Sequence, residues 1–226
     1  MVTGTSEPGR FKYFFIVQII LFAGLFTPLF IFQSIAEIDF WWWMSINIFL
    51  LFLFPVLSDK SYLKILRNDL SLGIFHKITL GLLSAFILYG IFYLGNQISR
   101  WIFSFAGEGI SQVYAFKQDA STLRIILLMA LLIGPGEEVI WRGYLQRHWV
   151  NRFGRRAGYF LSAAAYTLVH AASGNIMLIG AAGVCALFWG WIYLRYRSIL
   201  LVAVSHTVWD LLIFIILPLN NFNIHK

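Results

Sequence analysis

The chain has 226 residues, of which 60% are hydrophobic, 18% are aromatic and only 12% are charged, with a mean hydropathy of +0.77. Because a soluble domain carries about 25% charged residues and needs polar side chains over its surface, this composition excludes a soluble protein and indicates a membrane protein. The single cysteine, Cys185, also excludes an internal disulfide and hence a disulfide-stapled secreted fold.

Long apolar segments follow one another along the chain. Each approaches the roughly 20 residues that an α-helix needs to cross a bilayer. Runs this long and continuous favour helices over the short alternating strands of a membrane barrel. We therefore predict an all-α, polytopic membrane bundle of about seven transmembrane helices, at residues 11–32, 35–57, 75–94, 123–144, 158–173, 176–193 and 199–218.

Basic residues gather in the loops on one side of these predicted spans. With a cytoplasmic N-terminus, only Arg100, Lys117, Arg124 and Lys226 fall on the outer side. This bias follows the positive-inside rule and accounts for the net charge of +7 through contact with anionic lipid, without nucleic acid. The predicted inside residues are Arg10, Lys12, Lys60, Lys64, Arg67, Lys77, Arg142, Arg147, Arg152, Arg155, Arg156, Arg195 and Arg197.

The stretch 95–122 is the longest one outside the predicted spans. Within it, residues 101–105 have the sequence Trp-Ile-Phe-Ser-Phe. We expect these residues to form a short amphipathic helix at the outer interface.

Two adjacent carboxylates interrupt the fourth apolar segment. Glu137 and Glu138 follow residues 134–136, whose Gly-Pro-Gly sequence we expect to break the helix. Glu138 and Arg142 are four residues apart, so they share a helix face and are predicted to pair. Glu137 points about 100° away from Glu138 and is left out of this pair.

Two further motifs interrupt the apolar segments near the C-terminus. His170 follows Tyr166 by four residues, and Asp210 follows His206 by four residues. Any one of these groups has an ordinary explanation as a hydrogen-bonding contact between membrane helices. Because ionisable side chains inside a membrane are costly, their occurrence on three spans at comparable depth predicts an active site.

Together, these motifs resemble those of the CPBP family, the CAAX-protease and bacteriocin-processing group of intramembrane endopeptidases, which includes the type II CAAX prenyl endopeptidase. The resemblance implies a catalytic core at residues 123–217 and a variable part at residues 11–122, within one transmembrane domain over residues 1–226. The positions that match the family pattern are Glu137, Glu138, Arg142, His170, His206 and Asp210.

The resemblance also implies roles for these residues. Glu137 is expected to activate a water molecule that His170 helps to hold, while the pair of Glu138 and Arg142 supports them. His206, with residue 210, is expected to stabilise the tetrahedral intermediate.

Two positions depart from the commonest family pattern. Asp210 stands where Asn is frequent, and an ionised carboxylate cannot donate to an oxyanion. We therefore expect His206 to donate and Asp210 to fix its tautomer, as the Asp of a Ser-His-Asp triad does. Tyr166 stands where Phe is usual, and we expect it to add little beyond a hydroxyl near His170.

Three alternatives remain open. Glu137, His170 and His206 are also a ligand set for catalytic zinc, although no His-Glu-x-x-His helix is present; no cofactor is otherwise predicted. A non-catalytic bacteriocin-immunity or binding protein would use the same scaffold, and a transporter would also place carboxylates at mid-membrane. We predict a protease of the bacterial inner membrane that acts on a peptide or membrane-protein substrate; neither prenylation of the substrate nor the oligomeric state follows from the sequence.

Overall fold

The computed structural model describes residues 8–59, 61–117 and 120–221. Within these ranges every regular element is helical, which confirms the all-α class. The longer elements are α1 (Pro8–Phe32), α2 (Phe40–Ser58), α4 (Ile74–Ile102), α9 (Arg155–His170), α10 (Ile176–Tyr196) and α11 (Ile199–Leu211), which continues as η4 (Leu212–Ile216). The short ones are α3 (Tyr62–Asp69), α5 (Ala106–Ala115), η3 (Ala171–Ser173) and η5 (Leu219–Asn221).

One long helical segment runs through residues 122–153 and carries the first motif. It consists of α6 (Thr122–Leu128), η1 (Met129–Ile133), α7 (Gly134–Glu138), η2 (Val139–Gln146) and α8 (Arg147–Phe153). The predicted break at residues 134–136 is wrong, because the helix continues through them. Pro135 lacks an N–H, and the wider π-helical turns η1 and η2 on either side take up the change in hydrogen bonding, as π-bulges in membrane helices do.

Each of the predicted apolar segments lies mainly in helix. Four helical segments of the described chain are long and apolar enough to cross a membrane, namely α2, α4, α10 and the continuous 199–216 segment. The count of about seven spans and the cytoplasmic N-terminus stay predictions. Large apolar side chains are exposed on the outside of the bundle, such as Phe75 at 85% and Leu57 at 80%, as lipid-facing helices require.

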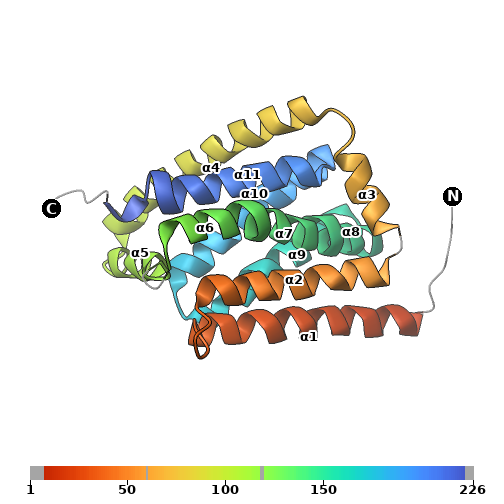
Figure 1. Cartoon of the computed structure of the whole chain (residues 1–226), viewed down its shortest axis with the longest axis horizontal. Helices are drawn as coiled ribbons and strands as arrows, with labels where there is room; N and C mark the ends of the chain where they lie inside the picture. Colours follow the sequence, from red (N-terminus) through yellow and green to blue (C-terminus); the bar gives the residue numbers. More distant parts are fainter. Residues whose placement is uncertain (1–7, 60, 118–119, 222–226) are drawn as a thin grey trace.

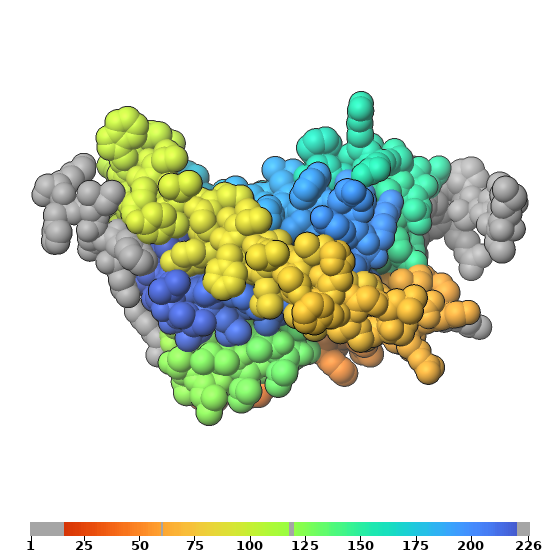
Figure 2. Space-filling model, turned by 90° about the horizontal axis from the view of Figure 1, so that it is seen from above, coloured from red at the N-terminus to blue at the C-terminus, as the bar shows by residue number. Residues whose placement is uncertain are grey.

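The long helices form a bundle in which successive helices run in opposite directions (Figure 1). The α1 and α2 pair lies along one side and α4 along the opposite side, with the 122–153 segment and α9 to α11 between them. Helix α4 packs along α11 and crosses the surface of the bundle (Figure 2). Helix α11 is the central element, because it contacts α4, α7 and α10.

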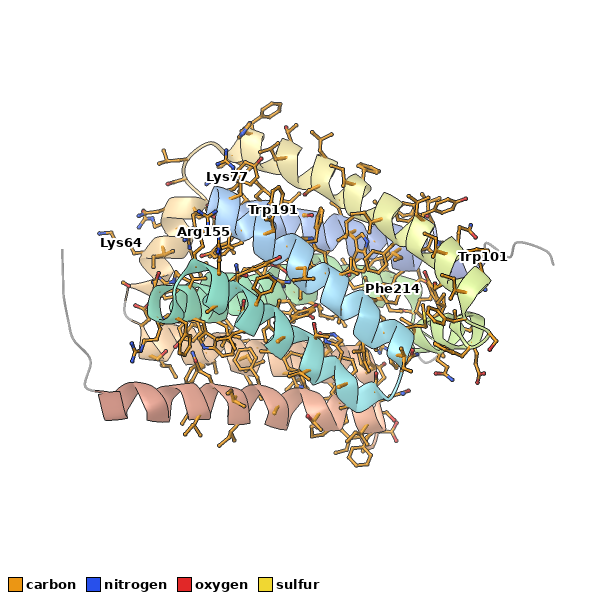
Figure 3. The ribbon with its side chains drawn as sticks, turned by 180° about the vertical axis from the view of Figure 1, so that it is seen from behind. Lys64, Lys77, Trp101, Arg155, Trp191 and Phe214 are labelled. Atoms are coloured by element: carbon orange, nitrogen blue, oxygen red, sulfur yellow. The ribbon has the colours of Figure 1, made fainter. Side chains whose placement is uncertain are left out.

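Three of the basic residues predicted on the inner side lie at one end of this bundle. Lys64, Lys77 and Arg155 are at the same end, whereas Trp101 is at the opposite end (Figure 3). Internal carboxylates pair with some of these cations: Asp69 lies 2.8 Å from Lys77, and Asp59 lies 2.7 Å from Arg147. Among the predicted loop charges, the side chains of Arg10, Lys12, Lys60 and Lys226 lie outside the described residues.

The predicted amphipathic helix at residues 101–105 is displaced. Trp101 and Ile102 are the last turn of α4, and the following residues form a turn into α5. The short helix therefore lies at Ala106–Ala115, where Tyr114 is buried and donates a 2.8 Å hydrogen bond to the carbonyl oxygen of Ile213. The apolar sequence that suggested a separate helix extends the end of a longer one.

Candidate active site

The carboxylate of Glu138 joins the motif at residues 137–142, the first of the three, to the motif at residues 206–210, the third. Its Oε1 atom accepts a 2.8 Å hydrogen bond from Nη1 of Arg142 and a 2.7 Å hydrogen bond from Nδ1 of His206. The predicted pair of Glu138 and Arg142 is confirmed, and all three side chains are buried. The contact with His206, 68 positions away, was not predicted, since helical spacing relates only residues on the same helix.

The imidazole of His206 lies between two carboxylates. Its Nε2 atom is 3.5 Å from Oδ2 of Asp210, while Nδ1 is held by Glu138. The role of Asp210 in fixing the tautomer stays a prediction, and the shorter contact to the ring comes from Glu138. An imidazolium at this position has a carboxylate oxygen facing each ring nitrogen.

Tyr166 connects the second motif to the first. Its hydroxyl donates a 2.8 Å hydrogen bond to Oε2 of Glu137, and both residues are buried. The expectation that this tyrosine adds only a hydroxyl near His170 missed that contact. The sequence shows that Tyr166 shares a helix face with His170. It gives no sign that the Tyr166 hydroxyl reaches the carboxylate of Glu137, 29 positions away.

His170 is oriented by the same helix. Its Nδ1 atom is 2.8 Å from the carbonyl oxygen of Tyr166, to which it donates, so Nε2 remains free to accept a hydrogen bond. The ring packs 4.9 Å from the ring of Tyr166 and 4.7 Å from that of Phe30 on α1. In the described residues, no hydrogen bond joins His170 to the side chains of Glu137 or His206.

Trp189 on α10 is a site residue that the sequence analysis missed. Its ring stacks on His206 with centroids 3.8 Å apart, and its Nε1 donates a 3.1 Å hydrogen bond to Oγ of Ser205. The Arg142 guanidinium lies 5.4 Å from the Trp189 ring and 4.8 Å from the Tyr166 ring. Helix α10 has no motif of its own, so only the packing identifies this tryptophan.

Close packing of two glycines brings α7 against its neighbours. A Cβ at Gly134 would lie 2.5 Å from Oγ1 of Thr207 on α11, and a Cβ at Gly136 would overlap the side chain of Ile48 on α2. Because Thr207 follows His206, the short distance at Gly134 is what allows Glu138 to reach the imidazole. The Gly-Pro-Gly sequence thus determines how closely α7 packs against α11 and α2, more than it changes the direction of the helix axis.

The alternative zinc set does not fit this arrangement. Within the described residues, no three His, Cys, Asp or Glu side chains are placed so that they could hold one metal ion. Both nitrogens of His206 face carboxylates, and Nδ1 of His170 is held by the carbonyl oxygen of Tyr166. Among the described residues, Glu137, His170 and His206 are therefore not placed as one set of metal ligands.

The site is closed to the outside. A small cavity of about 10 Å³ beside it is lined by side chains that include Arg142, Gln146 and Tyr166, which is about the room that one water molecule needs. Glu137 and His206 are 5% and 4% exposed. A molecule from outside therefore has to separate helices before it reaches these side chains.

Residues 119–212 match the family described as type II CAAX prenyl endopeptidase Rce1-like. The predicted family resemblance is confirmed. The match includes every predicted site residue from Glu137 to Asp210, although it covers less than half of the chain. Comparison with curated proteins and with solved structures gives no match. An Rce1-like segment supports a protease that acts on a peptide or protein and resides in a membrane.

Proposed function

We propose that the chain is an intramembrane endopeptidase that hydrolyses a peptide bond of a membrane-associated or lipidated peptide or protein, with water activated by Glu137. The observation that carries this proposal is the buried network of three motifs from distant parts of the chain. Glu138 accepts from Arg142 and His206, and Tyr166 donates to Glu137. Groups of this kind are costly inside a membrane, so their convergence favours chemistry over packing.

Glu137 is the proposed general base. Tyr166 holds Oε2, which leaves Oε1 to accept a proton from the attacking water. As the water oxygen bonds to the scissile carbonyl carbon, its proton passes to Glu137, and the carbonyl oxygen becomes an oxyanion. Collapse of the tetrahedral intermediate breaks the C–N bond, and Glu137 returns the proton to the leaving nitrogen.

His206 is the proposed oxyanion donor. Since Nδ1–H is held by Glu138, only Nε2 is available, and it carries a proton when the ring is an imidazolium. Asp210 and Glu138 face the two nitrogens and stabilise that charge. In a site that excludes water, such a preset donor stabilises developing charge strongly. Glu138 and Arg142 act by positioning His206, and His170 is proposed to help to hold the attacking water through its free Nε2.

The test is hydrolysis of reporter peptides by the purified chain. We expect Glu137→Gln to lower turnover by at least about a hundredfold, because the general base contributes about 10²–10⁴-fold. Glu108→Gln, on the short helix α5 outside the site, is the matched control and is expected to keep full activity. Equal processing by Glu137→Gln and the native chain would contradict the assignment of the base.

The same assay separates the alternatives. Undiminished activity in the presence of a zinc chelator is expected from the metal-free mechanism, and loss that added zinc restores would favour the zinc-dependent protease. Peptide binding without turnover across a broad panel, by the native chain and by Glu137→Gln alike, would instead favour a non-catalytic binding or immunity protein.

A further inference from the structure

A groove lies on the outside of the bundle, between α9 and α10, at the end where the basic residues gather. We propose that it binds an anionic phospholipid of the surrounding leaflet. Its volume is about 470 Å³. Arg155 on α9 and Trp191 on α10 lie near each other at this end of the bundle (Figure 3). The lining residues are Arg155, Arg156, Tyr159, Phe160, Trp191 and Leu194.

The charges at the groove are not neutralised from within the described chain. Arg155 and Arg156 are exposed, and no carboxylate of the described residues forms an ion pair with either of them. Elsewhere at the same end, Lys77 and Arg147 each have an internal carboxylate partner. The two arginines also occupy the first turn of α9, where the positive end of the helix dipole disfavours cations and favours an anion.

The remainder of the groove is apolar and faces outward. Phe160 is 60% exposed and Trp191 is 57% exposed, on helices whose outer faces carry other exposed apolar side chains such as Leu161 and Leu187. An indole and a phenol beside arginines are the combination found at the headgroup level of membrane proteins. This groove therefore runs from a cationic mouth into a surface that contacts acyl chains.

These two parts match the two parts of an anionic phospholipid. Guanidinium groups bind phosphate oxygens in a bidentate manner, and the apolar lining offers contact area to one acyl chain. A free phosphate ion would use the arginines but gain nothing from Phe160, Trp191 and Leu194. A zwitterionic lipid brings a cation next to two arginines, so charge complementarity selects the anionic headgroup.

Quenching of tryptophan fluorescence by brominated lipid tests the proposal. The full chain is reconstituted in phosphatidylcholine vesicles that contain either phosphatidylglycerol or phosphatidylcholine brominated on the acyl chains, and the difference between the native chain and Trp191→Phe reports on Trp191. We expect preferential quenching of Trp191 by the brominated phosphatidylglycerol. In Arg155→Gln/Arg156→Gln, half-maximal quenching is expected to need at least about tenfold more of this lipid, because each basic group near an anionic surface contributes about a fivefold factor in affinity.

Lys64→Gln/Arg67→Gln is the matched control, since it removes two exposed basic residues at the same end but on α3. We expect it to keep the native quenching. Equal losses in the two double variants would reduce the effect to diffuse surface charge and overturn the proposal, as would equal quenching by brominated phosphatidylcholine. Competition by inorganic phosphate alone, or displacement of the brominated lipid by a farnesylated peptide, would assign the groove to another ligand and overturn it as well.

Discussion

Glu138 is the residue around which the candidate site is built. A buried carboxylate that accepts from Arg142 and from His206 has its charge balanced by two hydrogen-bond donors, and Arg142 is further held between the rings of Tyr166 and Trp189. Glu137, the adjacent residue, has a neutral phenol as its partner. Two neighbouring carboxylates therefore have different environments, which suits a positioning role for one and a chemical role for the other.

Unfolding of two single variants tests this division. Glu138→Gln leaves the buried guanidinium of Arg142 without its counter-ion, and we expect it to lower the free energy of unfolding by about 3–5 kcal/mol. Glu137→Gln keeps an oxygen that accepts from Tyr166 and is expected to cost about 1 kcal/mol or less. Denaturant unfolding of both variants in detergent provides the measurement, and equal losses would contradict the ion-pair network.

Tyr166→Phe tests the hydroxyl that contacts Glu137. The substitution keeps the ring and its packing but removes the donor to Oε2. Because a hydrogen bond to a charged group is worth about 1.5–3 kcal/mol, we expect kcat/KM to fall by about tenfold to a hundredfold, with a shifted pH profile and little change in thermal stability.

Tyr159→Phe is the matched control for this prediction. It removes a hydroxyl from the same helix, one that donates to the carbonyl oxygen of Leu187 and not to a site residue. We expect this variant to retain its activity and pH profile. Identical profiles for Tyr166→Phe and the native chain would show that the hydroxyl does not act on the base.

At the scale of elements, the site depends on how closely α7 approaches α11. The residues of α7 are only a short part of the 122–153 segment, but Gly134 contacts Thr207 where any side chain would clash. The flanking π-helical turns η1 and η2 change the rotation of the helix before and after Glu137 and Glu138. Helix geometry and glycine packing together therefore direct Glu138 towards His206.

Gly134→Ala is predicted to disturb this approach. The added Cβ would lie 2.5 Å from Oγ1 of Thr207 and 3.1 Å from the carbonyl oxygen of Met129, so the helices must separate. We expect overpacking to cost about 1–3 kcal/mol in unfolding free energy and activity to fall with it. Gly90→Ala on α4 meets no atom within 4 Å and serves as the control, with unchanged or slightly raised stability. Tolerance of both substitutions would contradict the packing role of Gly134.

At the scale of the whole molecule, the positions of the charged and the exposed apolar side chains indicate how the bundle lies in a membrane. Lys64, Lys77 and Arg155 lie at one end of the bundle (Figure 3), and apolar side chains such as Phe75 and Trp101 are exposed on its outside. From the positive-inside rule we predict that the cationic end faces the cytoplasm. Along the chain, one long helix, α4, connects the short helices α3 and α5. If α4 crosses the membrane once, these two short helices lie on opposite sides of it.

Labelling of single cysteines tests this orientation. The buried Cys185 is first replaced in Cys185→Ala, and Lys64→Cys or Gln112→Cys is added. With an impermeant maleimide on intact cells, we expect labelling of the Gln112→Cys chain at once and of the Lys64→Cys chain only after the membrane is permeabilised. The reverse pattern would invert the orientation, and labelling of both chains from one side would contradict a crossing by α4.

The sequence by itself determined the class of the protein and the identity of the candidate residues. Low charge and long apolar runs predict membrane helices, because apolar side chains suit the lipid and a helix pairs its own backbone polar groups there. Helical spacing placed Glu138 with Arg142. The scarce ionisable residues inside the apolar segments also marked the candidate site. These inferences are local, because each depends on composition or on residues one helical turn apart.

Only the tertiary structure decided which groups from different helices meet. It placed Nδ1 of His206 against Glu138 and the hydroxyl of Tyr166 against Glu137. It also brought in Trp189, which no motif marks. Sequence spacing carries no information about contacts between helices, since these depend on how closely the helices pack, and here that approach is set by glycines without side chains.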